Sequence, residues 1–130
     1  MKNQQTILLV DDDMDYLFQQ KFQLERFGYK VVTAEGQKEA EELIKTLKPD
    51  LAIFDLMMES DDSGFILCYK MKRKYPDVPI ILSTAVSAET DMSFGITTDD
   101  ERKWIKADLY LEKGVLPERL QKEIKQLLKK

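Results

Sequence analysis

Short apolar runs alternate along the chain with longer segments in which apolar residues recur at helical spacing. The first run, Thr-Ile-Leu-Leu-Val at 6–10, stops at three aspartates and is typical of a strand buried on both faces. The pattern predicts strands at 6–10, 29–34, 51–55, 78–84 and 108–112. It predicts helices at 14–27, 36–47, 64–75, 99–106 and 116–128, with an irregular loop at 86–98.

Strands that alternate with helices along one chain predict a parallel α/β sheet with right-handed crossovers and helices on its faces. For five strands we expect the flavodoxin-like order 2-1-3-4-5, in which ligands bind beyond the carboxyl ends of the strands. The length of 130 residues fits one domain, 1–130. That domain is either a stand-alone protein or a part of a longer chain.

The helical segments also predict which side chains face the core. In 14–27 the apolar positions approximate one stripe, and we expect four phenylalanines of the chain to be buried: Phe18, Phe22, Phe27 and Phe65. Cys68 is the one cysteine, and it is expected to be a buried helix residue rather than a redox centre. Asp13 is expected to cap the helix that follows it.

Composition narrows the classes of partner. The net charge is −4 and no basic cluster stands out, which disfavours direct binding of nucleic acid. The chain has neither a signal-peptide pattern nor an apolar run of membrane-spanning length, so a cytoplasmic protein is expected. With no histidine in the chain, histidine bases and histidine metal sites are excluded within it.

Polar side chains stand at the carboxyl ends of four predicted strands. Asp11 and Asp12 follow the first strand, Asp55 ends the third, Thr84 ends the fourth and Lys113 follows the fifth. In the expected order these strand ends are neighbours, so three carboxylates, a hydroxyl and an ammonium converge on one crevice. Carboxylates this close repel one another, and a hard divalent cation with oxygen ligands relieves the repulsion. Mg²⁺ suits this set of ligands, whereas Zn²⁺ does not.

Four motifs, in the expected order, resemble the response-regulator receiver family of two-component signalling. They are Ile-Leu-Leu-Val-Asp-Asp-Asp at 7–13, Ile-Phe-Asp-Leu-Met-Met at 53–58, Ser-Thr-Ala at 83–85 and Tyr-Leu-Glu-Lys at 110–113. The resemblance covers essentially the whole chain. It implies the flavodoxin-like receiver fold and a phosphorelay function, with a sensor histidine kinase or a phosphotransfer protein as the partner that supplies the phosphoryl group from phosphohistidine.

The resemblance also implies a phosphoacceptor and a metal site. Asp55 matches the aspartate that takes the phosphoryl group. Asp11, Asp12, Asp55 and the backbone carbonyl of Met57 match the Mg²⁺ ligands, with Asp12 binding directly and Asp11 through water. The product is an aspartyl phosphate, which makes the chain a signalling switch that catalyses only its own phosphorylation and dephosphorylation.

Three further residues match the family's switching parts. Lys113 matches the active-site lysine, Thr84 the switch hydroxyl and Tyr110 the switch aromatic. Phosphorylation would then change a protein-interaction surface and its contact with an unknown downstream protein. The oligomeric state stays open, a homodimer included.

The chain departs from the family pattern at several places. Glu59 stands where proline is usual, in a loop one residue longer than usual, and Gly114 stands where a proline, often after a cis bond, follows the lysine. The segment from Thr84 to Lys113 is also long, with the excess in 86–98, and Met57 and Val86 are apolar where polar residues are frequent. These departures leave open a pseudo-receiver that binds proteins without phosphorylation. An aspartyl phosphatase is disfavoured, because it needs a carboxylate where Met57 stands.

Overall fold

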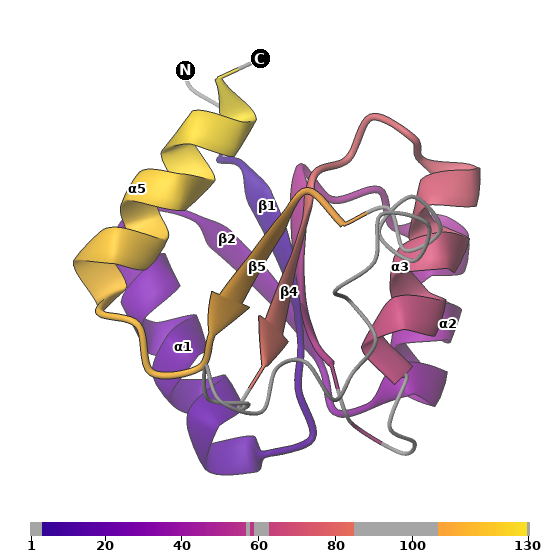
Figure 1. The fold of residues 1–130 in the computed structure, drawn as a ribbon, viewed down its shortest axis with the longest axis horizontal. Coiled ribbons are helices and arrows are strands. Elements are labelled where there is room, and N and C mark those ends of the chain that lie inside the picture. Colours follow the sequence, from indigo (N-terminus) through magenta and orange to yellow (C-terminus); the bar gives the residue numbers. More distant parts are fainter. Residues whose placement is uncertain (1–3, 57, 59–62, 85–106, 130) are drawn as a thin grey trace.

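The computed structural model describes residues 4–56, 58, 63–84 and 107–129, and of Thr84 only the backbone. Its elements, in chain order, are β1 (Thr6–Val10), α1 (Met14–Arg26), β2 (Lys30–Ala34), α2 (Gln37–Thr46), β3 (Leu51–Asp55), α3 (Ser63–Lys74), β4 (Ile80–Thr84), β5 (Leu109–Glu112) and α5 (Pro117–Leu128) (Figure 1). The ends agree with the predicted ones to within two residues. The helix predicted at 99–106 and the loop predicted at 86–98 lie outside the described residues.

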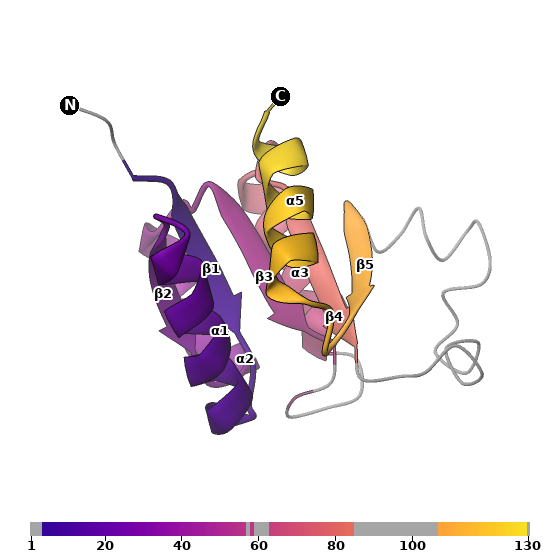
Figure 2. The ribbon, with the colours of Figure 1, turned by 90° about the vertical axis from the view of Figure 1, so that its left-hand side faces the viewer.

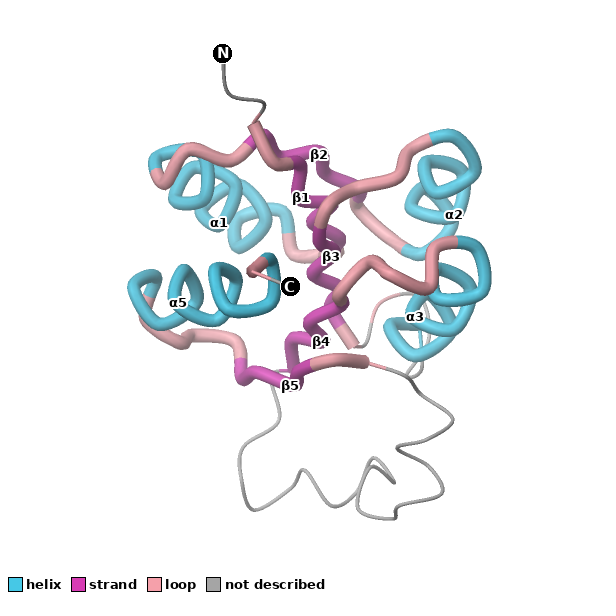
Figure 3. Tube along the Cα trace, turned by 90° about the horizontal axis from the view of Figure 1, so that it is seen from above, coloured by secondary structure: helices cyan, strands magenta, loops and turns pink. Residues whose placement is uncertain are grey.

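The strands form one parallel sheet in the order β2-β1-β3-β4-β5, which confirms the predicted topology. Helices α1 and α5 cover one face of this sheet, and α2 and α3 cover the other (Figures 1 and 3). Figure 2 looks onto this first face and shows α1 and α5 in front of the strands. Each face of the sheet therefore needs its own apolar core.

Alternation along the strands divides their side chains between the two cores. In β1, Ile7 and Leu9 face the core under α1 and α5, whereas Leu8 and Val10 face the core under α2 and α3. Strand β3 divides in the same way, with Ile53 on the first side and Phe54 on the second. Burial on both faces explains why these strands read as continuous apolar runs rather than as alternating ones.

Helix α1 corrects one expectation from the sequence. Phe18 and Phe22 were expected in the core, but 56% and 60% of their surfaces are exposed. Leu17 and Leu24 are the buried residues of this helix, and Phe18 lies about 100° round the helix from Leu17, since a helix has 3.6 residues per turn. The predicted burial of Phe65 is confirmed, and Phe27 packs partly buried at the edge of the core.

Two local features of the helices agree with the prediction. The carboxylate of Asp13 accepts a hydrogen bond from the Tyr16 backbone N–H at 3.2 Å and so caps α1. Cys68 is fully buried inside α3. Within the part of the chain that the structure describes, no helix is long and apolar enough to cross a bilayer.

Candidate functional site

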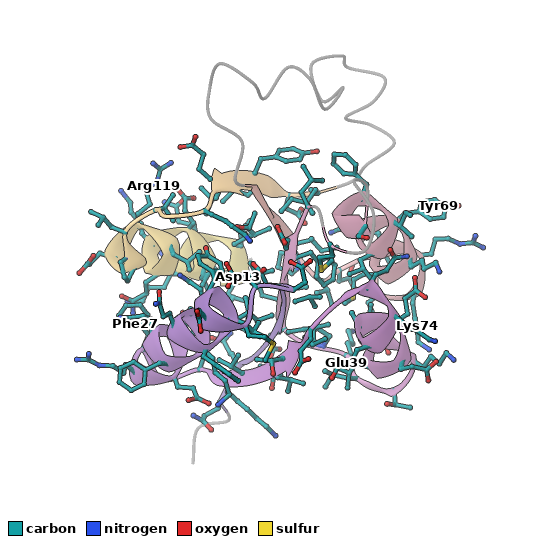
Figure 4. The ribbon with its side chains drawn as sticks, turned by 90° about the horizontal axis from the view of Figure 1, so that it is seen from below. Asp13, Phe27, Glu39, Tyr69, Lys74 and Arg119 are labelled. Atoms are coloured by element: carbon teal, nitrogen blue, oxygen red, sulfur yellow. The ribbon has the colours of Figure 1, made fainter. Side chains whose placement is uncertain are left out.

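Strand alternation and register bring the predicted site residues to one corner of the sheet. Asp11 continues the side of β1 that carries Ile7 and Leu9, and Asp55 continues the side of β3 that carries Ile53. Lys113 follows β5 on the side of Leu111. All three side chains therefore emerge on the α1/α5 side of the carboxyl edge, which is the edge seen in Figure 4, with Asp13 at the start of α1.

The ammonium of Lys113 joins two of the carboxylates. Its Nζ atom lies 2.9 Å from Oδ2 and 3.1 Å from Oδ1 of Asp11, and 3.4 Å from Oδ2 of Asp55. Asp11 and Asp55 are almost completely buried, and 18% of the Lys113 side chain is exposed. The remaining contact of Asp11 is local, because its Oδ1 accepts a hydrogen bond from the Asp13 backbone N–H at 2.9 Å.

Asp12 completes a set of three carboxylates that fits a divalent cation. One carboxylate oxygen from each of Asp11, Asp12 and Asp55 can be chosen so that all three lie within 4.8 Å of one another. Asp12 is exposed, whereas the other two are buried, so the cluster opens to solvent on the side of Asp12. Oxygen ligands with an open, wet side match the preference of Mg²⁺, which retains several water molecules.

The buried carboxylate of Asp55 carries the largest electrostatic perturbation in this cluster. Burial and, second, the negative charge of Asp11 raise the pKa of Asp55 from 3.8 to about 7, although Lys113 acts in the opposite direction. Burial opposes the charged form of Lys113, but the hydrogen bond to Asp11 and the charge of Asp55 outweigh it and raise the pKa of Lys113. Negative charge is therefore in excess at this site, and an added cation would relieve it.

Glycine lets α3 begin directly against the strand that carries Asp55. The Gly64 N–H donates a hydrogen bond to the Leu56 carbonyl at 2.8 Å. A Cβ atom at Gly64 would lie 2.5 Å from the Asp55 carbonyl oxygen and 2.7 Å from Cα of Leu56, closer than real contacts allow. The end of β3 and the first turn of α3 thus hold each other in place only because residue 64 has no side chain.

The other predicted residues are placed only in part. Thr84 ends β4 one residue beyond Ser83, the register partner of Asp55, and its side chain lies outside the described part. Tyr110 is half-buried against the core on the α2/α3 side. Met57, Glu59 and Val86 lie outside the described residues.

The turn after Lys113 differs from one built on proline. Gly114 has a φ of +94°, which is in the left-handed region and closed to proline, whose ring holds φ near −65°. Among the described residues no peptide bond is cis. Glycine at this position therefore gives the chain a different turn from β5 into α5, and Lys113 emerges from that turn.

Two residues of the site were missed by the sequence analysis, Tyr16 and Ser83. The Lys113 Nζ atom lies 4.8 Å from the centroid of the Tyr16 ring. Burial raises the pKa of the Tyr16 hydroxyl, and the nearby hydrogen-bonding groups of Ser83 and Gly114 act in the opposite direction. Tyr16 and Ser83 also line a small cavity of about 20 Å³ beside Asp11 and Asp55. Tyr16 could have been suspected from its place four residues after Asp12, and Ser83 from its place two residues after the buried Ile81.

Comparisons with known proteins agree with this fold and site. Residues 7–125 match the model of the response regulator receiver domain. A curated relative, the alkaline phosphatase synthesis transcriptional regulatory protein PhoP of Bacillus subtilis, is 32% identical over 124 residues, which cover 95% of this chain and 48% of PhoP. The chain thus spans about half the length of the curated relatives it matches.

Solved structures give the same result. A CheY-like response regulator receiver domain protein from Methanospirillum hungatei is 28% identical, with a TM-score of 0.81 over 97% of this chain and 94% of that one. The response regulator TrrA from Thermotoga maritima, solved in complex with Mg²⁺ and BeF, is 28% identical, with a TM-score of 0.78 over 95% of this chain and 98% of that one. A parallel sheet of this order, an acidic cluster at its carboxyl edge and a family match over nearly all of its length together show that this chain belongs to the response regulator receiver domain family, a class of signalling switches rather than enzymes.

Proposed function

We propose that Asp55 is the phosphoacceptor of this receiver and that it accepts the phosphoryl group in the presence of Mg²⁺. The observation that carries the proposal is the convergence of Asp55 with Asp11, Asp12 and Lys113 at the carboxyl edge of the sheet. Oδ2 of Asp55 lies 3.4 Å from the Lys113 ammonium, and one of the Asp55 oxygens lies within 4.8 Å of carboxylate oxygens of Asp11 and Asp12, so its attacking oxygen has near it the groups that act on a transferred phosphoryl group. Asp12 is exposed, so the side of the cluster on which it lies leaves a path for the donor.

The donor that fits this site is a phosphohistidine on a sensor histidine kinase or a phosphotransfer protein. A carboxylate oxygen of Asp55 bonds to phosphorus while the phosphorus–nitrogen bond of the donor breaks. The imidazole nitrogen keeps the electron pair of the broken bond, and Asp55 becomes an acyl phosphate. The donor must supply the histidine, because this chain contains none.

Asp11, Asp12 and Asp55 would hold the cation, and the backbone carbonyl of Met57 is the proposed fourth protein ligand. The exposed position of Asp12 favours a direct ligand role, whereas Asp11 is already engaged by Lys113 and the Asp13 N–H and is better suited to act through water. When bound, Mg²⁺ supplies the positive charge that stabilises the transferring oxygens.

Lys113 is the proposed protein cation in the same step. Its ammonium already lies between Asp11 and Asp55, so it can remain near Asp55 and donate a hydrogen bond to a new phosphoryl oxygen. In the free protein this ammonium also offsets the charge of the two buried carboxylates. Loss of Lys113 would therefore slow the transfer and leave the carboxylates uncompensated.

The proposed switch runs from Asp55 to the last two strands. Thr84 ends β4 one residue beyond Ser83, the register partner of Asp55, and its hydroxyl is the proposed contact of the new phosphoryl group. Tyr110 lies on the neighbouring strand β5 and packs partly buried, so a shift of the β4 end can change its packing. The expected output is a changed surface for a downstream protein.

Acetyl phosphate, a small phosphodonor, tests the proposal without knowledge of the partner kinase. The parent protein, Asp55→Asn and the control Asp77→Asn are incubated with acetyl phosphate and Mg²⁺ and weighed as intact proteins. Asp77 is an exposed aspartate in the turn after α3, remote from the site. We expect one added phosphoryl group on the parent and on Asp77→Asn, none on Asp55→Asn, and none on any of them after chelation of Mg²⁺.

A protein that is folded but takes up no phosphoryl group would contradict the proposal. The pseudo-receiver, which binds proteins without phosphorylation, would then be the better description, with Glu59 and Gly114 as the departures that explain it. Phosphorylation that persists in Asp55→Asn would instead move the acceptor to another residue.

A further inference from the structure

Tyr16 lies at the site where α1, the end of β4 and the turn after β5 meet. It lies in the first turn of α1, and its hydroxyl is near hydrogen-bonding groups of the Ser83 side chain on β4 and of the Gly114 backbone beyond β5. The face of its ring lies under the Lys113 ammonium, with 4.8 Å from Nζ to the ring centroid. One side chain thus contacts both the lysine and the residue that follows it.

Lys113 needs such a support because little else on its own strand restrains it. A lysine side chain is a flexible four-carbon stem, and ordering it costs up to about 2 kcal/mol of conformational entropy. The next residue, Gly114, has a φ of +94° and no side chain, and a Cβ built there would meet nothing within 4 Å. The turn after Lys113 therefore has no packed side chain of its own at position 114.

A small cavity beside the ring gives Tyr16 a second effect. Tyr16 forms part of the wall of the cavity of about 20 Å³ that also touches Asp11 and Asp55. With a smaller residue in its place, this cavity would extend into the space that the ring fills beneath the ammonium. The ring thus keeps the ammonium on the side where Asp11 and Asp55 lie, at 2.9 Å and 3.4 Å.

We propose that Tyr16 is a positioning residue that holds Lys113 over Asp11 and Asp55, through its ring beneath the ammonium and its hydroxyl tether to Ser83 and Gly114. This inference rests on the proposed function of Lys113 in phosphoryl transfer. Tyr16 does not touch the transferred group, so it acts through the lysine. Its loss should slow phosphorylation while the carboxylates keep their affinity for Mg²⁺.

Two substitutions separate the ring from the hydroxyl. Tyr16→Phe keeps the ring and removes the hydroxyl with both of its contacts, and we expect its phosphorylation rate constant with acetyl phosphate to fall about fivefold, which corresponds to about 1 kcal/mol for the whole tether. Tyr16→Leu removes both, and we expect a fall on the order of twentyfold, because a cation over an aromatic ring adds a comparable contribution. The Mg²⁺ concentration at half-maximal rate should stay the same in both variants.

Tyr69 supplies a matched control on the other side of the molecule. Its ring also lies against a cation, with Arg73 at 5.7 Å from the centroid, but it is exposed on α3, at the margin of the view in Figure 4. Tyr69→Phe and Tyr69→Leu should leave the phosphorylation rate constant at its parental value. A loss of rate shared by the Tyr69 variants would point to general destabilisation and would overturn the assignment to Tyr16.

Proton NMR of the unphosphorylated protein tests the placement independently of phosphorylation. The ring current of Tyr16 should shift the Lys113 ε-methylene protons upfield in the parent and in Tyr16→Phe, and this shift should disappear in Tyr16→Leu. Unchanged lysine shifts in Tyr16→Leu, or parental rate constants in both Tyr16 variants, would overturn the inference. If the parent itself takes up no phosphoryl group, the proposed function fails, and the NMR result alone decides whether Tyr16 holds Lys113.

Discussion

The buried charge of Asp55 should make the metal-free protein less stable at neutral pH than an uncharged variant. The pKa of Asp55 is raised from 3.8 to about 7, chiefly by burial and then by the charge of Asp11. The folded protein therefore keeps a proton on Asp55 at pH values where the unfolded chain has lost it. Because the unfolded chain binds fewer protons in this window, stability falls as the pH rises from about 4 to about 7.

The magnitude follows from the same rise in pKa. A rise in the pKa of Asp55 from 3.8 to about 7 corresponds to at most about 4 kcal/mol in the free energy of unfolding, because each pKa unit is worth about 1.4 kcal/mol. Relaxation of the site and hydration on the side of Asp12 reduce this value, and we expect a gain of about 2 kcal/mol for Asp55→Asn at pH 8. The gain should be smaller at pH 5, where the folded parent still holds the proton.

Chemical denaturation in the presence of a chelator measures this gain. The parent, Asp55→Asn and Asp77→Asn are unfolded by urea at pH 5 and at pH 8, and the free energies of unfolding are compared. Asp77→Asn, at an exposed position, should match the parent at both pH values. Added Mg²⁺ should stabilise the parent more than Asp55→Asn, since it binds the folded state through the intact carboxylates. An Asp55→Asn variant that is no more stable than the parent at pH 8 would refute the electrostatic reasoning.

Three further substitutions or reactions test other parts of the structure. Gly64→Ala should lower the free energy of unfolding, measured with urea, by about 2–3 kcal/mol, because its Cβ would overlap the backbone of Asp55 and Leu56. A loss smaller than that of an ordinary exposed substitution would show that α3 can move away from β3. Gly114→Ala should lower the free energy of unfolding by only about 1 kcal/mol in the same urea experiment, since a Cβ there meets nothing within 4 Å and the strain comes from the positive φ alone. A larger loss for Gly114→Ala than for Gly64→Ala would contradict this explanation. The Cys68 thiol is fully buried, and burial raises its pKa to about 12, so a thiol reagent at pH 8 should label it only in denaturant; rapid labelling of the native protein would contradict its placement.

The strands, their order and the polar groups at their ends could be predicted, because these depend on local patterns and on rules for parallel sheets. Continuous apolar runs identify strands buried on both faces, and right-handed crossovers with a common strand order then place the strand ends side by side. These rules place Asp11, Asp55 and Lys113 at one edge of the sheet, and in the structure the Lys113 Nζ atom lies 2.9 Å from Asp11 and 3.4 Å from Asp55. The cap at Asp13 was equally local, since it needs only one side chain and the first turn of a helix.

Which side of helix α1 faces the core depended on the tertiary structure. Helix α1 carries apolar residues on more than one side, so its sequence alone does not determine which side faces the sheet. The sheet selects Leu17 and Leu24, because these two fit the core beside Ile7 and Leu9, and that rotation leaves Phe18 and Phe22 exposed. The same rotation turns Tyr16 towards the strand ends.

The contact of Tyr16 with Lys113 shows what only the tertiary structure decided. These residues are far apart in the sequence, and their meeting depends on the rotation of α1, on the register of β4 with β5 and on the left-handed turn at Gly114. None of these three features has a local signature that places the ring under the ammonium. The sequence by itself determined which chemical groups stand at the strand ends. The packing of α1 and the turn before α5 determined how those groups are held, because the position of a side chain follows from the rotation of the whole element that carries it.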